Sequence, residues 1–182
     1  MKIRLNGVRL AFPDLFTARA VNGEGEPAFG ATFLIAADDP QLEVIENTLE
    51  EVATDKWGPK AAAILKQLRA ADKTCLHDGE AKSQYNGFAG CMYIAARSKE
   101  RPLVIDADKS PLVAADGRPY SGCYVNASID IWAMDNQYGK RIAASLKGVQ
   151  FHRNGDAFTG GGAASADDFD DVTAPEAVED LV

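Results

Sequence analysis

Apolar and polar residues alternate along the first stretch of the chain, residues 2–12. Alternation with a period of two is typical of a half-buried β-strand. The phase of the pattern shifts at Gly7, which predicts a bulge or bend in this strand. The turn-rich segment at residues 22–27 then leads into a second alternating run, so we predict a second strand. The apolar positions are Ile3, Leu5, Val8, Leu10 and Phe12 in the first strand and Phe29, Ala31, Phe33 and Ile35 in the second.

The apolar pattern then changes to the period of a helix. Asp39 followed by Pro40 is typical of a helix N-cap with proline in the first turn. A second helix start at Gly58-Pro59 leads into residues 60–70, and the helical segment ends near Asp72. The apolar faces predicted for these two helices are Leu42, Ile45, Leu49 and Val52, and then Ile64, Leu65 and Leu68.

Strand-like patterns return after the helices. A helical insertion within an otherwise antiparallel series of strands favours a mainly β protein, with an OB-type Greek-key barrel and one or two helices. The same order of elements also suits an open α+β sheet, and the pattern does not decide between them. The strand-like runs are Met92 to Ala96, Leu103 to Ile105, Cys123 to Ile131 and Ile142 to Leu146.

Charge divides the chain into two parts. The 182-residue chain carries a formal net charge of -8, but residues 160–182 contain seven acids and no Lys or Arg. That segment combines low hydrophobicity with high charge density, so we predict a disordered acidic tail following a single domain of residues 1–159. The domain itself is nearly neutral, and its basic residues are available for a polyanionic partner.

Few residues suggest metal or redox chemistry. Cys75, Cys91 and Cys123 are an odd number without a CxxC spacing, so we expect reduced thiols and not the disulfide framework of a secreted domain. His77 and His152 make no metal-ligand spacing with them. We therefore expect neither a metal nor a cofactor.

Signatures of catalysis and membrane insertion are also missing from the sequence. It contains no phosphate-binding GxxxxGK[ST] loop, no GxSxG and no HExxH, so we predict a protein that is not an enzyme. A metal-dependent nuclease built on Asp106, Asp108 and Asp116 stays open as the weaker alternative. No apolar run is long enough to cross a membrane, and the first residues do not form a secretory core, so we expect a cytoplasmic protein.

Aromatic and basic side chains share faces of the predicted strands. The run from Cys123 to Trp132 places Tyr124 and Trp132 opposite its small aliphatic residues, and the run at Met92 does the same with Tyr93 and Arg97. Single-stranded nucleic acid is bound by such a combination, because rings stack on bases and cations follow the phosphates. The alternative is that these rings pack under the helices and the basic groups form a solvated loop.

A resemblance to a known family strengthens the nucleic-acid interpretation. The stretch of residues 88–162 resembles a family of phage-encoded single-stranded DNA-binding proteins, most specifically in SKERP at 98–102, YSGCYV at 120–125 and LKGVQ at 146–150. The resemblance extends to residues 4–16 and to Asp168-Phe169. Two positions depart from it, because Trp132 stands where a tyrosine-like ring is expected and the sequence closes with Leu181-Val182 in place of an aromatic residue.

The resemblance implies an OB fold that coats single strands during phage replication or recombination in the cytoplasm of the host cell. It also implies an acidic tail that contacts replication or recombination proteins, through Asp167, Asp168, Phe169, Asp170 and Asp171. The principal rival is a non-enzymatic protein-interaction module with a solubilising tail. The sequence leaves open whether the chain acts as a monomer or a homodimer.

We hypothesise that DNA lies across the barrel, with rings stacking on bases and cations contacting phosphates. Trp57, between the helices, is expected to be a hydrophobic anchor instead. The leading DNA-binding candidates are Tyr93, Arg97, Lys99, Arg101, Lys109, Tyr124, Trp132, Lys140 and Lys147. Further aromatic candidates near turns are Tyr85, Phe88, Tyr120 and Tyr138, of which Tyr85 and Phe88 lie in a segment expected to be exposed.

Overall fold

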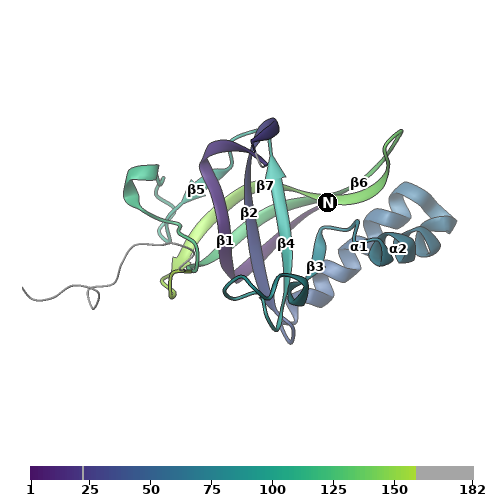
Figure 1. Ribbon diagram of the computed structural model, residues 1–182, viewed down its shortest axis with the longest axis horizontal. Helices are drawn as coiled ribbons and strands as arrows, with labels where there is room; N and C mark the ends of the chain where they lie inside the picture. Colours follow the sequence, from purple (N-terminus) through teal and green to yellow (C-terminus); the bar gives the residue numbers. More distant parts are fainter. Residues whose placement is uncertain (22, 159–182) are drawn as a thin grey trace, which may run out of the picture.

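The computed structural model describes residues 1–21 and 23–158, and within these residues seven strands form a single sheet (Figure 1). None of the helices in this part of the chain is long and apolar enough to cross a membrane. The five main strands are β1 (Lys2–Val21), β2 (Glu24–Ala36), β4 (Cys91–Ser98), β6 (Tyr124–Asn136) and β7 (Gly139–Arg153). The two short strands are β3 (Leu76–Asp78) and β5 (Leu103–Ile105).

The sheet closes into a barrel. β1 pairs antiparallel with both β2 and β6, β2 pairs with β4, and β6 pairs with β7. A parallel pairing of β4 with β7, registered at Arg97 and Ser145, joins the two ends. The predicted OB-type barrel is therefore confirmed, and the open sheet is excluded. β3 and β5 add short edges to β4 and β7.

The barrel interior is filled by alternate residues of each strand, as the two-residue period requires. Leu10, Phe33, Ile94, Ile129 and Ile142 are among the fully buried side chains. The predicted bulge in β1 is also confirmed, because Gly7 has a φ of 60° and the register with β6 shifts between Leu5 and Val8. This bend lets one long strand contribute to both sides of the barrel.

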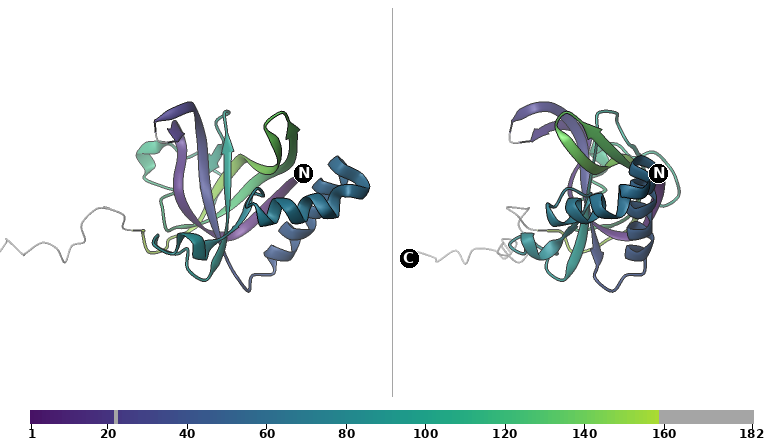
Figure 2. Two further views of the ribbon diagram at one scale, coloured as in Figure 1. Left: turned by 45° about the vertical axis from the view of Figure 1, so that its right-hand side comes forward. Right: turned by 90° about the vertical axis from the view of Figure 1, so that its right-hand side faces the viewer.

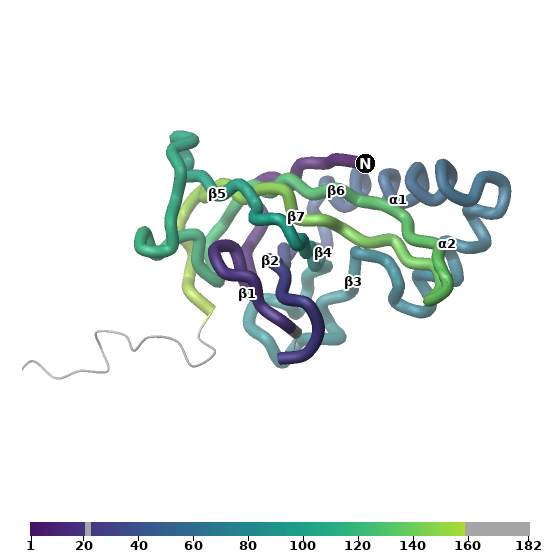
Figure 3. The backbone as a smooth tube through the Cα atoms, turned by 90° about the horizontal axis from the view of Figure 1, so that it is seen from above, coloured from purple at the N-terminus to yellow at the C-terminus, as the bar shows by residue number. Residues whose placement is uncertain are grey.

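A helical hairpin packs beside the hairpin of β6 and β7 (Figure 3). It comprises α1 (Gln41–Trp57), a short 3-10 turn (Gly58–Lys60) and α2 (Ala61–Ala70). Pro40, and not Asp39 as predicted, takes the N-cap position of α1, while Asp39 Oδ1 accepts a hydrogen bond from the amide of Gln41, the first residue of the helix, at 2.9 Å. The indole of Trp57 packs against the core and donates to Asp135 Oδ2 at 2.9 Å, as expected for an anchor.

Two long hairpins project from the barrel on either side of the end of β4 (Figure 2, left). One joins β1 to β2 and the other joins β6 to β7. In OB folds the face of the second and third barrel strands binds oligonucleotides, together with the loops between strands one and two and strands four and five. These positions correspond to β2, β4 and the two hairpins of this barrel.

Candidate nucleic-acid interface

The outer face of β6 carries the aromatic residues predicted for it. Val125 and Ile131 point into the core, whereas Tyr124 and Trp132 lie on the opposite face, so the prediction of two faces is confirmed. Trp132 is 40% exposed, and its Nε1 donates to Ser145 Oγ at 2.9 Å on the neighbouring strand. The hydrogen bond fixes the ring on the surface of the barrel instead of under the helices.

The ring of Tyr124 already carries cationic neighbours. The guanidinium of Arg153 lies 3.7 Å from the ring centroid, and that of Arg9 lies 5.7 Å away. Cation–π contacts of this kind contribute about 0.5–2 kcal/mol. A base that stacks on Tyr124 would have to rearrange these arginines, so Tyr124 is a less open platform than Trp132.

Tyr93 and Phe88 are not on an open surface. They are 6% and 1% exposed, and together with Ala11 and Leu34 they form a second apolar cluster on the outside of the barrel. The ring of Tyr93 packs 5.3 Å from that of Phe88 and 4.9 Å from that of His77. The expectation that Phe88 is exposed is therefore wrong, and Tyr93 presents no face to a base in this structure. The loop of residues 79–90 folds back and covers both rings.

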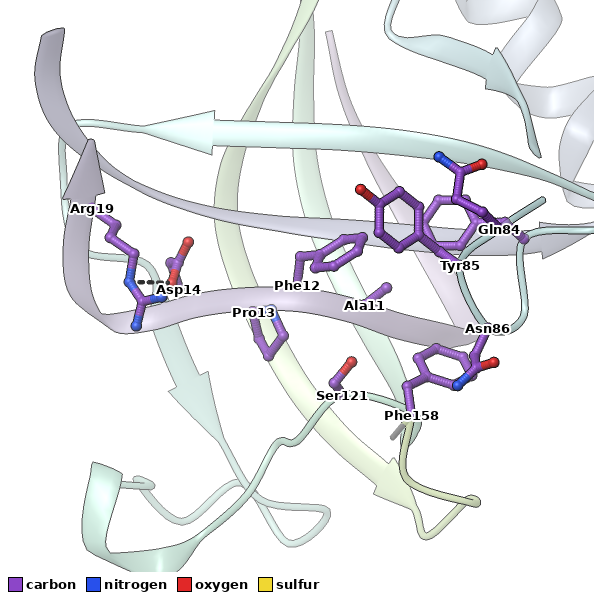
Figure 4. A pocket seen from close by; sticks show the side chains of 11 residues that line it. Ala11, Phe12, Pro13, Asp14, Arg19, Gln84, Tyr85, Asn86, Ser121 and Phe158 are labelled. Carbon is purple, nitrogen blue, oxygen red and sulfur yellow. Dashed lines mark ion pairs between the residues drawn. The ribbon is translucent and has the colours of Figure 1, made fainter. Parts of the chain in front are cut away.

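Two other rings are exposed beside this cluster. Phe12 is 51% exposed and Tyr85 is 45% exposed, and their rings meet edge to face with centroids 5.3 Å apart. They line a pocket of about 470 Å³ (Figure 4). Other side chains lining it are Asp14, Arg19, Gln84, Asn86, Ser121 and Phe158.

The sequence pattern missed Phe12, because the alternation of β1 placed it in the core. Its φ of 47° departs from the strand conformation and turns the side chain outward. Pro13 was the available signal, since proline within a strand marks an edge or a bulge. Arg9, Arg19, Arg153 and Phe158 were also missed, and no local pattern distinguishes them.

A shallower hollow of about 220 Å³ continues from the pocket and shares Phe12, Asp14 and Arg19 with it. Arg97 forms part of its wall. Small residues line the rest of it, so that a ligand can approach the strands closely: Ala20, Ala28, Gly30, Ala31, Thr32, Ala95 and Ala96.

Arg97 connects this hollow to Trp132. The Cα partner of Arg97 across the barrel closure is Ser145, whose hydroxyl holds the Trp132 indole. One surface therefore leads from Tyr85 and Phe12 past Arg97 to Trp132, crossing β1, β2, β4, β7 and β6 in turn. This surface is the candidate interface, and we call it the DNA track.

The predicted cations differ in their surroundings. Lys99 pairs with Glu26, Lys140 Nζ lies 3.8 Å from Asp135, and all these groups are exposed or partly so. Exposed pairs contribute little, about 0–1 kcal/mol, so these lysines can exchange a carboxylate for a phosphate at low cost. Arg101 and Lys147 are exposed, and Lys109 lies in the loop after β5.

Tyr120 and Tyr138 have different environments. Tyr138 lies at the tip of the hairpin of β6 and β7 and is 84% exposed. Tyr120 is half-buried, and its hydroxyl donates to Asn154 Oδ1 at 2.9 Å. Tyr138 is therefore accessible to a strand, whereas Tyr120 fastens the segment that follows β7.

That segment, residues 154–158, returns to the pocket. Arg9 Nη2 donates to the Asp156 carbonyl at 2.8 Å, and the Phe158 amide donates to the Ser121 carbonyl at 3.0 Å. The guanidinium of Arg9 also lies 4.3 Å from the Phe158 ring centroid. The predicted tail residues come later in the sequence and lie outside the described residues: Asp167, Asp168, Phe169, Asp170 and Asp171.

The three aspartates considered for metal binding stabilise the loop after β5. Asp106 pairs with Arg118, which lowers the pKa of the Asp106 carboxyl. Hydrogen bonds from Ser110 lower the pKa of Asp108, and Asp116 accepts from the Val113 amide. Across residues 1–21 and 23–158, no group of three or more histidines, cysteines, aspartates or glutamates is placed to hold a metal ion.

All three cysteines are free. Cys75 and Cys123 are buried and Cys91 is half-buried. Burial raises the pKa of the Cys75 thiol to about 12, so this side chain stays protonated and unreactive at neutral pH.

A family model described as the ssDNA-binding protein of Enterobacter phage Enc34 matches residues 1–181. The chain belongs to this family. The protein p50 of Acyrthosiphon pisum secondary endosymbiont phage 1 is 49% identical to this chain over 182 aligned positions, which cover 98% of each chain. The family resemblance predicted from the sequence is therefore confirmed for the Enc34 ssDNA-binding protein family.

Solved structures share the fold of this Enc34-family protein. The single-stranded DNA-binding protein of bacteriophage Enc34, in complex with ssDNA, superposes with a TM-score of 0.72 at 24% identity, over 86% of this chain and 89% of that one. The gp2.5 single-stranded DNA-binding protein of bacteriophage T7 gives a TM-score of 0.59 at 13% identity, over 92% of each chain. At these identities the likeness concerns the OB fold.

Proposed function

We propose that this protein binds single-stranded DNA along the DNA track without sequence preference. The observation that carries the proposal is the continuity of the surface from Phe12 past Arg97 to Trp132. Membership of the Enc34 family supports the same ligand. The protein-interaction module predicted as the principal rival does not explain why exposed rings and arginines share one continuous surface.

The chemistry of the track explains tolerance of sequence. Stacking of a base on an aromatic ring contributes about 1–3 kcal/mol, and every base has such a face. Contacts between cations and phosphates carry no sequence information. A duplex keeps its bases stacked inside, so rings at Phe12, Tyr85 and Trp132 favour flexible single strands. The phosphate contacts we propose are Arg19, Arg97, Lys99, Arg101, Lys140 and Lys147.

We assign the protein a non-enzymatic role in coating single strands during phage DNA replication or recombination, in the cytoplasm of the host cell. Its acidic residues 160–182 would recruit replication or recombination proteins. In the absence of DNA they would also compete for the basic groups of the track, because a run of carboxylates resembles a chain of phosphates. Phe158 lines the pocket, so residues 154–158, which precede the acidic residues in the sequence, lie at the track. This position supports the second role.

Fluorescence anisotropy with a labelled oligonucleotide, single-stranded or annealed to its complement, tests the proposal. We expect tighter binding of the single strand and a fall in log affinity with log salt of slope about -4, for about six phosphate contacts. Equal binding of both probes at low salt would overturn it. Mg²⁺ is added in a parallel sample, where degradation of the probe would indicate a nuclease.

A matched pair of variants locates the site. Arg97→Ala removes a cation from the track, whereas Lys66→Ala removes an exposed cation from α2. We expect the first variant to weaken binding and to reduce the salt slope by about one, and the second to leave both unchanged. Equal effects of the two variants would mean that only net charge matters.

A further inference from the structure

The pocket at Phe12 differs from the hollow that continues from it. Its volume of about 470 Å³ is roughly twice that of the hollow, and the rings of Phe12, Tyr85 and Phe158 form its walls. Pockets of about 300–1,000 Å³ with apolar walls and a few polar groups are typical of small-molecule sites. The hollow, lined by small residues and Arg97, suits a sugar-phosphate backbone, whereas the pocket suits a planar group.

Phe12 is held in a conformation that costs free energy. Its φ of 47° lies in the left-handed region, which is an outlier for a bulky residue and is unfavourable. Such strain persists when the surroundings fix it, and it is concentrated at functional sites. The rings of Tyr85 and Phe88, 5.3 Å and 5.9 Å away, hold Phe12 in place while half of its surface stays open.

Polar groups stand at both ends of the pocket. Gln84 and Asn86 flank Tyr85 in the same loop, and the ion pair of Asp14 with Arg19 lies on the other side of Phe12 (Figure 4). Gln84 and Asn86 are exposed, so their amides are accessible to a ligand. The arginine at the far end is placed to meet a phosphate of the same strand.

An amide offers a donor and an acceptor side by side. Each of the four DNA bases also presents a neighbouring donor and acceptor along its pairing edge. Because a side-chain amide can turn over to exchange its two groups, Gln84 and Asn86 can match any base. The site would therefore require a base edge without selecting one base.

We propose that one base of the bound strand leaves the stack and enters this pocket, where Phe12 and Tyr85 contact its face and Gln84 and Asn86 bind its edge. This inference rests on the proposed function and adds a defined subsite to it. Stacking elsewhere on the track needs only a flat ring. The pocket needs a ring that forms hydrogen bonds.

Two oligonucleotides of equal length separate these requirements. One is oligothymidylate, and the other carries 2,4-difluorotoluene in place of each thymine, which keeps the shape of the ring but lacks a hydrogen-bonding edge. We expect the protein to bind the thymine strand about fivefold more tightly. In the double variant Gln84→Ala, Asn86→Ala this preference should fall to about one. The matched control Gln67→Ala, an exposed amide on α2, should keep it.

Each outcome has one meaning. Equal binding of the two strands by the unaltered protein, or a preference that survives in the double variant, would overturn the base pocket and leave the DNA track intact. Failure to bind either strand would overturn the proposed function itself. The single variants Gln84→Ala and Asn86→Ala are measured too, so that an unfolded double variant does not remove the test.

Photo-crosslinking places the base directly. An oligothymidylate with scattered 5-iododeoxyuridine is irradiated in complex with the protein, and the adduct is located by peptide mass spectrometry. We expect adducts in the peptides containing Phe12 or Tyr85. Adducts confined to the peptide containing Trp132 would overturn the inference, because stacking would then occur only at the other end of the track.

Discussion

Trp132 and Trp57 show how the surroundings of one residue type decide its role. Both indoles donate a hydrogen bond from Nε1, to Ser145 and to Asp135 respectively. Trp57 packs against the core beside the helices, whereas Trp132 stands on the outer face of β6 with 40% of its surface exposed. Only Trp132 therefore offers a face to a ligand.

Replacing Trp132 by Ala should weaken binding of single-stranded DNA about 5- to 150-fold, because stacking on one aromatic ring contributes about 1–3 kcal/mol. The measurement is a titration of a fluorescent oligonucleotide at fixed salt. Trp57→Phe is the matched control, since it alters the other indole and should leave the affinity unchanged. An unaltered affinity of folded Trp132→Ala would remove this residue from the DNA track.

Asp106 predicts a dependence of stability on acid pH. Arg118 holds the pKa of the folded Asp106 carboxyl below its unfolded value, so the ion pair stabilises the fold fully above the ordinary aspartate pKa of about 4. That contribution is lost as pH falls through the lowered folded pKa. The variant Asp106→Asn should therefore melt at a lower temperature than the unaltered protein at pH 6, and the gap should start to narrow below about pH 4 and close once the pH is below the lowered pKa of the folded protein. A gap that is the same at every pH would contradict the assignment.

Among the elements, the segment of residues 154–158 depends on a close approach to Gly122. A Cβ at Gly122 would lie 2.2 Å from the Asp156 carbonyl oxygen and 2.8 Å from the Phe158 amide nitrogen. Its φ of 104° is also unfavourable for other residues. Glycine at this position thus permits the segment to cross the barrel and bring Phe158 to the pocket.

Gly122→Ala should destabilise the protein by more than backbone strain alone. The matched control is Gly117→Ala, because Gly117 also has a positive φ, of 70°, but a Cβ there meets nothing within 4 Å. We expect a loss of about 1 kcal/mol for Gly117→Ala, or about 2–4 °C in Tm, and at least twice that for Gly122→Ala. Equal losses, measured by thermal unfolding, would show that the segment moves aside freely.

An element could be predicted from the sequence where the local pattern of residues determines it, and not where contacts between distant segments do. The two faces of β6 follow from the alternation of Val125 and Ile131 with Tyr124 and Trp132, because a strand has a fixed period. The outward turn of Phe12 follows from one backbone angle, which leaves the apolar pattern unchanged. Burial of Phe88 and Tyr93 depends on contacts between the loop of residues 79–90 and distant strands, which no local pattern records.

At the scale of the whole molecule, most of the net negative charge belongs to one terminal segment, and the rest of the chain is nearly neutral. Residues 160–182 carry seven acids and no base. The attraction that we propose between this segment and the basic groups of the track would be strongest at low ionic strength, where screening is weak. The overall charge of -8 is therefore no argument against DNA binding by the domain.

Deletion of residues 160–182 should raise the affinity for single-stranded DNA several-fold at low salt, because a competitor for the cations is removed. The difference should shrink as salt rises above about 0.2 M, since both interactions are then screened. Affinity of the two proteins is compared across a salt series with one oligonucleotide. Equal affinity at low salt would leave the tail with recruitment of partners as its sole role.

The closure of the barrel lies beneath the proposed DNA track. β4 and β7 join through the registered pair of Arg97 and Ser145, and Ser145 also holds Trp132. A strand bound at both Arg97 and Trp132 would touch the sheet on each side of this seam. Since a ligand stabilises the conformation it binds, DNA bound along the proposed track would hold β4 and β7 together and make the barrel more resistant to unfolding.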